Sequence, residues 1–110
     1  METADTHFPD GYLAEGTPTP YDSQYANVIA YSTKQTVEFV RWIQQQPFYE
    51  NTTIVLIGDH LSMDKNFFKD FDPSYQRTTF NLILNPAPTV ADTPAQYYND
   101  RTWAVFDMFP

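Results

Sequence analysis

The sequence contains no cysteine, which excludes disulfide bonds and thiolate chemistry. Basic residues are scarce: 6 lysines and arginines stand against 14 aspartates and glutamates, giving a net charge of −8. This balance argues against nucleic-acid binding, which needs a basic face to neutralise phosphates, and against simple adsorption to an anionic membrane. No hydrophobic run approaches the length of a membrane span. The abrupt beginning and end predict that the sequence is a piece of a longer protein.

Apolar and aromatic residues are plentiful despite these absences. Hydrophobic residues make up 42% of the chain, including 9 Phe, 8 Tyr and 2 Trp. Such a composition builds a packed core, so the 9 prolines do not indicate disorder. We therefore expect residues 1–110 to form one domain or part of one.

A long helix is predicted to begin near Asp22 or Ser23, either of which can cap free N–H groups. Pro47 disfavours helical geometry at Gln46, so the helix should end there. Residues at spacings of three and four form one apolar stripe; they are Tyr25, Val28, Ile29, Ser32, Thr36, Phe39, Val40 and Ile43. Trp42 is also expected to pack.

Two apolar strands are predicted after the helix. The first runs from Thr53 to Ile57, and its consecutive branched residues suit a strand that is buried on both faces of a parallel sheet. The second runs from about Thr79 to Leu84 and is ended by Asn85-Pro86. A helix followed by a buried strand is half of a βαβ unit, so residues 3–6 are expected to end an earlier parallel strand. Another element can begin at residues 101–109, but this stretch is too short to assign.

Asp59 and His60 follow the first strand directly and are the sharpest chemical signal. Ligands bind at the carboxyl ends of strands in open α/β sheets, and carboxylate oxygen with imidazole nitrogen suits Zn²⁺ or Mn²⁺. The pair converges only if the strand has ended, a change of direction that Gly58 is expected to permit. An Asp-His dipeptide by itself is more often a turn and a surface histidine.

His7 is the other histidine, and the turn-forming Pro9-Asp10-Gly11 follows it closely. We hypothesise that it meets Asp59 and His60 on one edge of the sheet. The remaining acids are expected to be turn or cap residues rather than ligands; they are Asp5, Asp10, Asp64, Asp70 and Asp72. Arg77 and Arg101 match the oxygens of a phosphate, although a surface or ion-paired arginine is the commoner case. The sequence has no glycine-rich phosphate loop and no Gly-x-Ser-x-Gly elbow.

Two segments together resemble the bacterial phosphoglycerol transferase and lipoteichoic acid synthase family, within the sulfatase and alkaline-phosphatase-like superfamily. They are Asp5-Thr6-His7-Phe8-Pro9-Asp10-Gly11-Tyr12 and Thr53-Ile54-Val55-Leu56-Ile57-Gly58-Asp59-His60-Leu61-Ser62-Met63. Residues 31–42, the strand ending at Asn85-Pro86 and residues 101–110 fit the same pattern. The resemblance implies an α/β fold, namely a fragment of a three-layer structure with a mainly parallel sheet flanked by helices.

The family's roles transfer to three residues of this chain. Asp59 and His60 match its metal-binding pair, usually for manganese, with zinc, magnesium or calcium as alternatives. His7 matches the histidine that contacts the glycerol-phosphate group, which makes it a substrate-binding and catalytic candidate. The family's threonine nucleophile and glutamate ligand lie upstream and have no match here. Residues 1–110 would then be part of a catalytic domain and inactive alone.

The implied reaction moves glycerol phosphate from a phosphatidylglycerol-like lipid to a glycan or glycolipid acceptor. The parent protein would be anchored in a membrane with its catalytic domain outside the cytoplasm, and the fragment itself would be soluble. An open sheet edge would favour self-association. Two alternatives remain at this point: a sulfate or phosphate ester hydrolase of the same superfamily, and a non-catalytic α/β interaction module.

Overall fold

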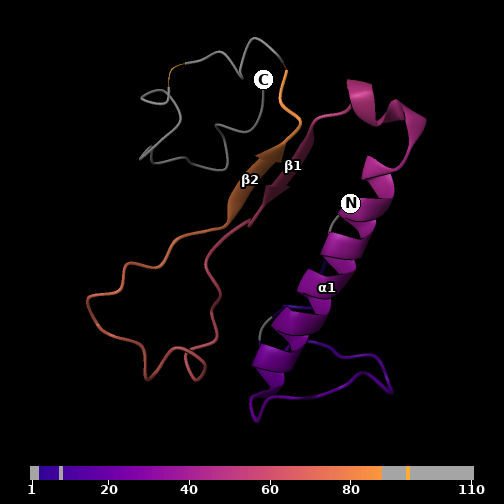
Figure 1. Cartoon of the computed structure of the whole chain (residues 1–110). Coiled ribbons are helices and arrows are strands. Elements are labelled where there is room, and N and C mark those ends of the chain that lie inside the picture. Colours follow the sequence, from indigo (N-terminus) through magenta and orange to yellow (C-terminus); the bar gives the residue numbers. More distant parts are fainter. Residues whose placement is uncertain (1–2, 8, 88–93, 95–110) are drawn as a thin grey trace. The chain divides into compact units, whose positions relative to one another are not determined.

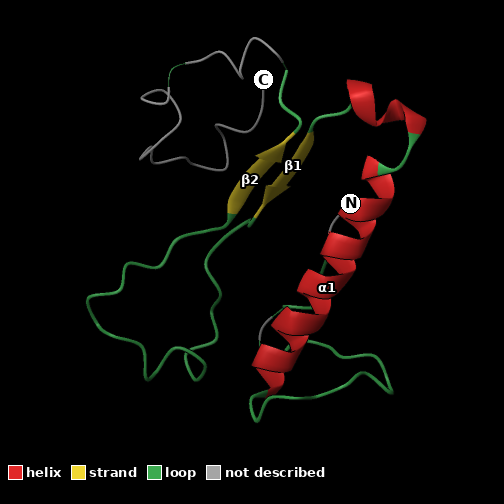
Figure 2. Cartoon of the chain, viewed as in Figure 1, coloured by secondary structure: helices red, strands yellow, loops and turns green. Residues whose placement is uncertain are grey.

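The computed structural model describes residues 3–7, 9–87 and 94. The described residues form a mixed α/β structure with helix α1 (Gln24–Gln44), the 3₁₀ helix η1 (Pro47–Asn51) and strands β1 (Ile54–Ile57) and β2 (Asn81–Leu84) (Figures 1 and 2). The chain divides into two compact units. The first unit comprises Met1–Gln46 and Leu61–Arg77, and the second comprises Pro47–His60 and Thr78–Pro110.

Helix α1 begins where the sequence predicts. Ser23 is the N-cap in extended geometry, and its hydroxyl accepts a hydrogen bond of 3.2 Å from the Ala26 N–H. Asn27 anchors the preceding loop: its side chain accepts from the Tyr21 N–H at 2.9 Å and donates to the carbonyls of Tyr21 and Ser23. These bonds explain how an amide can be buried on the inner face of the helix, a position that the apolar pattern did not include.

The predicted apolar stripe is confirmed in part. Tyr25, Val28, Ser32 and Val40 are buried along α1. Phe39 is 40% exposed, and Trp42, which was expected to pack, is 52% exposed and stacks on Phe39 with 5.9 Å between ring centroids. The helix ends at Gln44, shortly before the predicted end, because the N–H groups of Gln45 and the residue after it bond back to the last turn.

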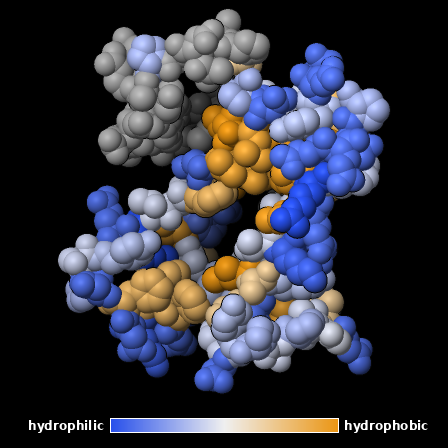
Figure 3. Space-filling model, viewed as in Figure 1, coloured by the Kyte–Doolittle hydropathy of each residue, from blue (hydrophilic) through white to orange (hydrophobic). Residues whose placement is uncertain are grey.

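The two strands of the second unit correct the predicted sheet. β1 and β2 pair antiparallel, with Val55 opposite Ile83. The prediction that β1 is buried on both faces is wrong: Ile54 is buried, whereas Val55 and Ile57 are 47% and 40% exposed. Successive side chains alternate across a strand, so Ile54 and Leu56 lie on one face of β1, and the exposed Val55 and Ile57 lie on the other, open face. Figure 3 shows hydrophobic side chains gathered at the surface over these strands.

β2 ends as predicted, and Asn85 provides the reason. Its backbone adopts a positive φ of 51°, a conformation that asparagine tolerates better than most residues. Its side-chain amide donates to the carbonyls of Tyr49 and Thr52 at 2.8 and 3.0 Å. The Thr53 hydroxyl in turn donates to the Asn85 carbonyl at 3.0 Å. Asn85 therefore ties the end of β2 to the segment that leads from η1 into β1.

The strand predicted to end at residues 3–6 is absent. Residues 4–7 instead form a turn, in which the His7 N–H donates to the Ala4 carbonyl at 3.1 Å. The described residues therefore contain no parallel strand pair. Residues 101–109 lie outside the described residues. No helix among the described residues combines the length and the apolar character that crossing a membrane requires.

Candidate functional site

Asp59 and His60 lie just beyond the end of β1 in the second unit. The Gly58 N–H donates to the Phe80 carbonyl at 2.8 Å. The backbone therefore stays hydrogen-bonded to the segment that leads into β2 as far as Gly58, the residue before Asp59. The chain then bends, and Asp59 Oδ1 accepts a hydrogen bond of 2.9 Å from the His60 N–H. The other carboxylate oxygen, Oδ2, lies 3.4 Å from His60 Nε2. The two side chains therefore converge, as the metal-pair interpretation requires.

The role predicted for Gly58 is not supported. Its φ lies outside the left-handed region, and a Cβ at this position would meet Phe80 N and Thr79 Cβ at 3.5 Å, an ordinary van der Waals contact. A side chain is therefore sterically possible here. Within the bend after β1, the Asp59 carboxylate accepts a hydrogen bond from the N–H group of the next residue.

The donor pair fits one side of a metal site. Ligand bonds of about 2.1 Å at a tetrahedral angle place two donor atoms about 3.4 Å apart, and Asp59 Oδ2 and His60 Nε2 have this separation. Both side chains are exposed, at 83% and 61%, so an ion can reach them. Within the described part of the chain, no three acidic or histidine side chains form a metal-binding group. Asp59 and His60 would thus supply two ligands of an incomplete set.

His7 lies in the first unit, in a loop closed by backbone hydrogen bonds. The Gly11 N–H donates to the His7 carbonyl at 3.0 Å, and the Tyr12 N–H donates to the Asp5 carbonyl at 2.7 Å. Gly11 has a φ of +67°, and a Cβ there would lie 2.6 Å from the Asp5 oxygen. The predicted turn is confirmed, and it requires glycine at its tightest point.

A chain of hydrogen bonds joins the His7 loop to the segment that follows His60 in the sequence. The Tyr25 hydroxyl donates to the Thr6 carbonyl at 3.1 Å and lies 2.7 Å from Ser62 Oγ. Because the tyrosine proton goes to Thr6, the serine proton is directed to Tyr25, while Ser62 Oγ accepts from the Asp64 N–H at 3.3 Å. The hydrogen bonds in such a chain polarise and strengthen one another.

Sequence reasoning placed Tyr25 in the apolar stripe and missed this link. The available signal was general: a buried tyrosine hydroxyl usually finds a hydrogen-bond partner. The identity of the partner, 37 residues away in the sequence, had no local signal.

Three of the other charged candidates, Asp64, Asp72 and Arg77, have structural roles. Asp64 Oδ1 accepts hydrogen bonds from the N–H groups of Asn66 and Phe67, and Asp72 accepts two from Ser74, as the turn interpretation predicts. The backbone N–H of Ser74, and then its hydroxyl, lower the pKa of Asp72 below its ordinary value of 3.8. Arg77 donates to the Ser62 carbonyl and lies over the Phe68 ring at 3.8 Å. Arg101 lies outside the described residues.

The structure therefore brings Asp59 and His60 together and places His7 in a separate compact unit. The predicted convergence of all three residues stays a prediction.

Comparison with known proteins supports the family that the two motifs suggest. The chain is 27% identical to phosphoglycerol transferase I of Citrobacter koseri over 96 residues, which cover 78% of this chain and 12% of that protein. It is 26% identical over the same length to phosphoglycerol transferase I of Salmonella paratyphi B and of Salmonella newport. The chain is a homologue of phosphoglycerol transferase I. It spans about an eighth of the length of these relatives, 12% in each case.

Other comparisons add no further relationship. No protein-family profile matches the chain, and no solved structure shows significant similarity to it. The homology to phosphoglycerol transferase I and the geometry at the end of β1 are thus the two observations that bear on function.

Proposed function

We propose that this chain is part of a metal-dependent phosphoglycerol transferase, to which it contributes two metal ligands and one substrate-binding histidine. The observation that carries the proposal is the 3.4 Å separation of Asp59 Oδ2 and His60 Nε2 at the end of β1. The similarity to phosphoglycerol transferase I supplies the reaction class. Manganese is the proposed ion, with zinc, magnesium and calcium as alternatives that accept the same donors.

Each of the three residues has a defined task in this proposal. The Asp59 carboxylate and the His60 imidazole hold the ion, and the hydrogen bond from the His60 N–H fixes the orientation of the carboxylate. When bound, the metal supplies Lewis-acid stabilisation of phosphoryl oxygen charge. His7 orients the phosphate of the donor or moves a proton near it. The nucleophile and further ligands are proposed to lie outside these 110 residues.

Within the first unit, a hydrogen bond anchors the loop that carries His7. Tyr25 ties Thr6, the residue before His7, to Ser62, which follows His60 by two residues. The Tyr25 hydroxyl is therefore proposed to hold the loop that carries His7 in place for the reaction.

We further propose a three-layer parent fold with a mainly parallel sheet. The open face of β1 and β2 supports it, because Val55, Ile57 and Ile83 are each at least 40% exposed and would be covered by additional elements. Without neighbouring strands, two copies of the chain should associate through the open edge of this sheet. Sedimentation at increasing concentration tests this point, and a clean monomer at high concentration would contradict it.

The partners follow from the proposed reaction. The donor is a lipid-linked glycerophosphate of the phosphatidylglycerol type, and the acceptor is a glycan or glycolipid. Nucleic acid is not a proposed partner because the net charge is −8. The longer protein is proposed to be membrane-anchored, with its catalytic domain outside the cytoplasm.

Metal binding by the 110-residue chain is the first test. Mn²⁺ is titrated into ¹⁵N-labelled chain, and paramagnetic broadening is followed along the sequence. We expect broadening centred on Asp59 and His60 that also reaches His7. The His60→Ala variant should weaken binding at least about tenfold, since even the loss of an outer hydrogen-bonding partner costs 10- to 100-fold. Glu50→Gln, an exposed acid of the same unit, should leave binding unchanged.

Two results would count against the site. Broadening spread over many acids, and equal for Glu50→Gln and wild type, would show nonspecific binding. Broadening at Asp59 and His60 that spares His7 would remove His7 from the site.

The activity test uses the longer protein that carries this chain. Manganese-dependent release of diacylglycerol from phosphatidylglycerol, abolished by His60→Ala, is the expected result. Cleavage of a generic sulfate or phosphate ester without diacylglycerol release would indicate the hydrolase instead. If neither assay detects activity, the non-catalytic interaction module is the remaining alternative.

A further inference from the structure

Tyr25 joins two segments of the first unit that are far apart in the sequence. Its hydroxyl donates to the Thr6 carbonyl at 3.1 Å and lies 2.7 Å from Ser62 Oγ. Its ring meets the Phe67 ring edge to face, with 5.4 Å between centroids. The side chain is only 6% exposed, and a hydrogen bond is stronger in such shielded surroundings than in water. Tyr25 therefore connects the His7 loop to the segment of the chain that contains Ser62 and Phe67.

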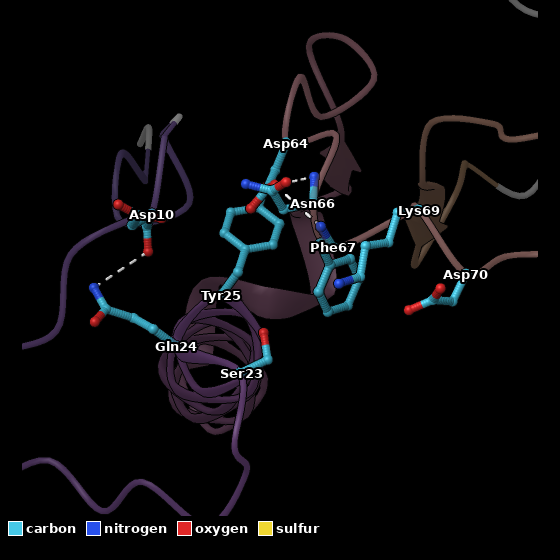
Figure 4. A pocket seen from close by; sticks show the side chains of 9 residues that line it. All are labelled: Asp10, Ser23, Gln24, Tyr25, Asp64, Asn66, Phe67, Lys69 and Asp70. Atoms are coloured by element: carbon cyan, nitrogen blue, oxygen red, sulfur yellow. Dashed lines mark hydrogen bonds between the residues drawn. The ribbon is translucent and has the colours of Figure 1, made fainter.

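A cleft of about 400 Å³ lies between these two segments, beside the N-terminal end of α1. Asp10 of the His7 loop lines one side, and Asn66 and Phe67 line the other (Figure 4). Tyr25 rises from the helix between them. Atoms across an open cleft are too far apart for van der Waals contact, so on this side the His7 loop depends on Tyr25 for its position.

Arg77 contacts both of the groups that hold Tyr25 in this segment. Its guanidinium donates to the Ser62 carbonyl, and the central carbon of the guanidinium lies 3.8 Å from the centroid of the Phe68 ring. The Phe68 ring in turn meets the Phe67 ring edge to face, with 5.0 Å between centroids. One path of contacts thus runs from Arg77 through Ser62 to the Tyr25 hydroxyl, and a second runs through the two phenylalanine rings to the Tyr25 ring. A single guanidinium therefore supports Tyr25 at two points.

The arginine side chain is suited to both contacts at once. A guanidinium is planar, so its face can lie over an aromatic ring while its N–H groups donate hydrogen bonds. Arg77 is half-buried, which strengthens both interactions by limiting competition from water. Although an arginine also matches the oxygens of a phosphate, this guanidinium is held by Ser62 and Phe68. Its contacts therefore indicate that it supports neighbouring side chains.

We propose that Arg77 is a positioning residue for His7. It fixes the Tyr25 side chain at the hydroxyl and at the ring, and Tyr25 in turn holds the carbonyl of Thr6, the residue before His7. All of these residues belong to the first unit. The consequence for the reaction rests on the proposed function, in which His7 contacts the phosphate of the donor. Removal of the guanidinium loosens Tyr25 at both points, so the His7 loop opens more often.

The test measures how often the His7 loop opens, by amide hydrogen exchange of the 110-residue chain. The N–H groups of Gly11 and Tyr12 report on opening, because they donate to the carbonyls that close the loop. In Arg77→Met, which keeps an unbranched apolar side chain, their exchange should be about 3- to 10-fold faster, as for the loss of about one hydrogen bond. Arg77→Lys, which keeps a donor and the charge, should restore part of the protection. Arg41→Met removes the same charge from an exposed position of α1 and should leave both rates unchanged.

A double-mutant cycle separates positioning of the His7 loop from general destabilisation. In the Tyr25→Phe background, Arg77→Met should change the two exchange rates by less than about twofold, because both paths from Arg77 end at Tyr25 and its hydrogen bond to Thr6 is already lost. Equal acceleration in both backgrounds would overturn the proposal. Unchanged rates in Arg77→Met, or equal effects of Arg77→Met and Arg41→Met, would overturn it too.

The longer protein tests the consequence for the reaction. Arg77→Met should lower kcat/KM for the lipid donor by about 3- to 10-fold, and an unchanged kcat/KM despite faster exchange would remove the positioning role. The failure of the transferase proposal is distinguishable. Faster exchange in Arg77→Met, combined with no diacylglycerol release by the longer wild-type protein, would confirm that Arg77 supports the loop and would remove the role of His7 in transfer.

Discussion

The hydroxyl of Tyr25 is a single atom whose removal tests how the first unit is held together. It donates to the Thr6 carbonyl at 3.1 Å and accepts from Ser62 at 2.7 Å, and the side chain is only 6% exposed. Tyr25→Phe removes this atom and keeps the ring and its contact with Phe67. Each lost hydrogen bond costs about 0.5–1.5 kcal/mol, so the free energy of unfolding should fall by about 1–3 kcal/mol.

Urea unfolding followed by far-UV circular dichroism measures this loss. For a chain of this size the slope is about 1–3 kcal/mol per molar urea, so the midpoint should fall by about 1 M. Tyr31→Phe is the matched control, because within the described part of the chain the Tyr31 hydroxyl makes no hydrogen bond. If the two variants unfold within about 0.5 kcal/mol of each other, the Thr6–Tyr25–Ser62 link does not stabilise the chain.

Three further predictions concern caps, turns and pH. Ser23→Ala removes the N-cap of α1 and should cost about 1 kcal/mol in urea unfolding, and a Ser23→Thr variant that fails to retain stability would argue against capping. Gly11→Ala should be far more destabilising than Gly16→Ala in the same assay: both have positive φ, but only at Gly11 would the new Cβ clash, at 2.6 Å, and equal losses would contradict this geometry. Because Ser74 lowers the folded-state pKa of Asp72 below 3.8, the stability that Asp72 contributes is present above that value and is lost as pH falls through the lowered pKa. The free energy of unfolding of the Asp72→Asn variant should lack this part of the fall at acid pH. A dependence on pH equal to that of the wild type would contradict the prediction.

Local features of the fold were predictable because they depend on neighbouring residues. The Ser23 cap, the apolar spacing and Pro47 define α1 to within about two residues. Asn85-Pro86 marks the end of β2. The burial of β1 was predicted wrongly, since a run of branched residues does not reveal which strands pair with it. The residues before α1 were assigned to a strand but form a turn closed by the His7 N–H group.

In the candidate site too, local features were predictable from the sequence, whereas contacts between distant segments were not. Asp59 and His60 were identified from adjacency and from their position after a strand, and their convergence at 3.4 Å agrees with that interpretation. The role expected of Gly58 is not supported, because its φ lies outside the left-handed region. The cleft beside Tyr25 was not predicted, since its lining comes from three separate segments of the chain.

The sequence by itself determined where the helix and the two strands lie, which two candidate ligands follow β1, and which turns need glycine or aspartate. These properties follow from capping, periodicity and backbone sterics, which act over a few residues. Only the tertiary structure decided that β1 pairs antiparallel with β2, that Tyr25 bonds to Thr6 and Ser62, and that Asn66 and Asp10 line one cleft. Such contacts depend on how distant segments pack, and no local pattern records the partner that a buried hydroxyl or a strand edge will meet.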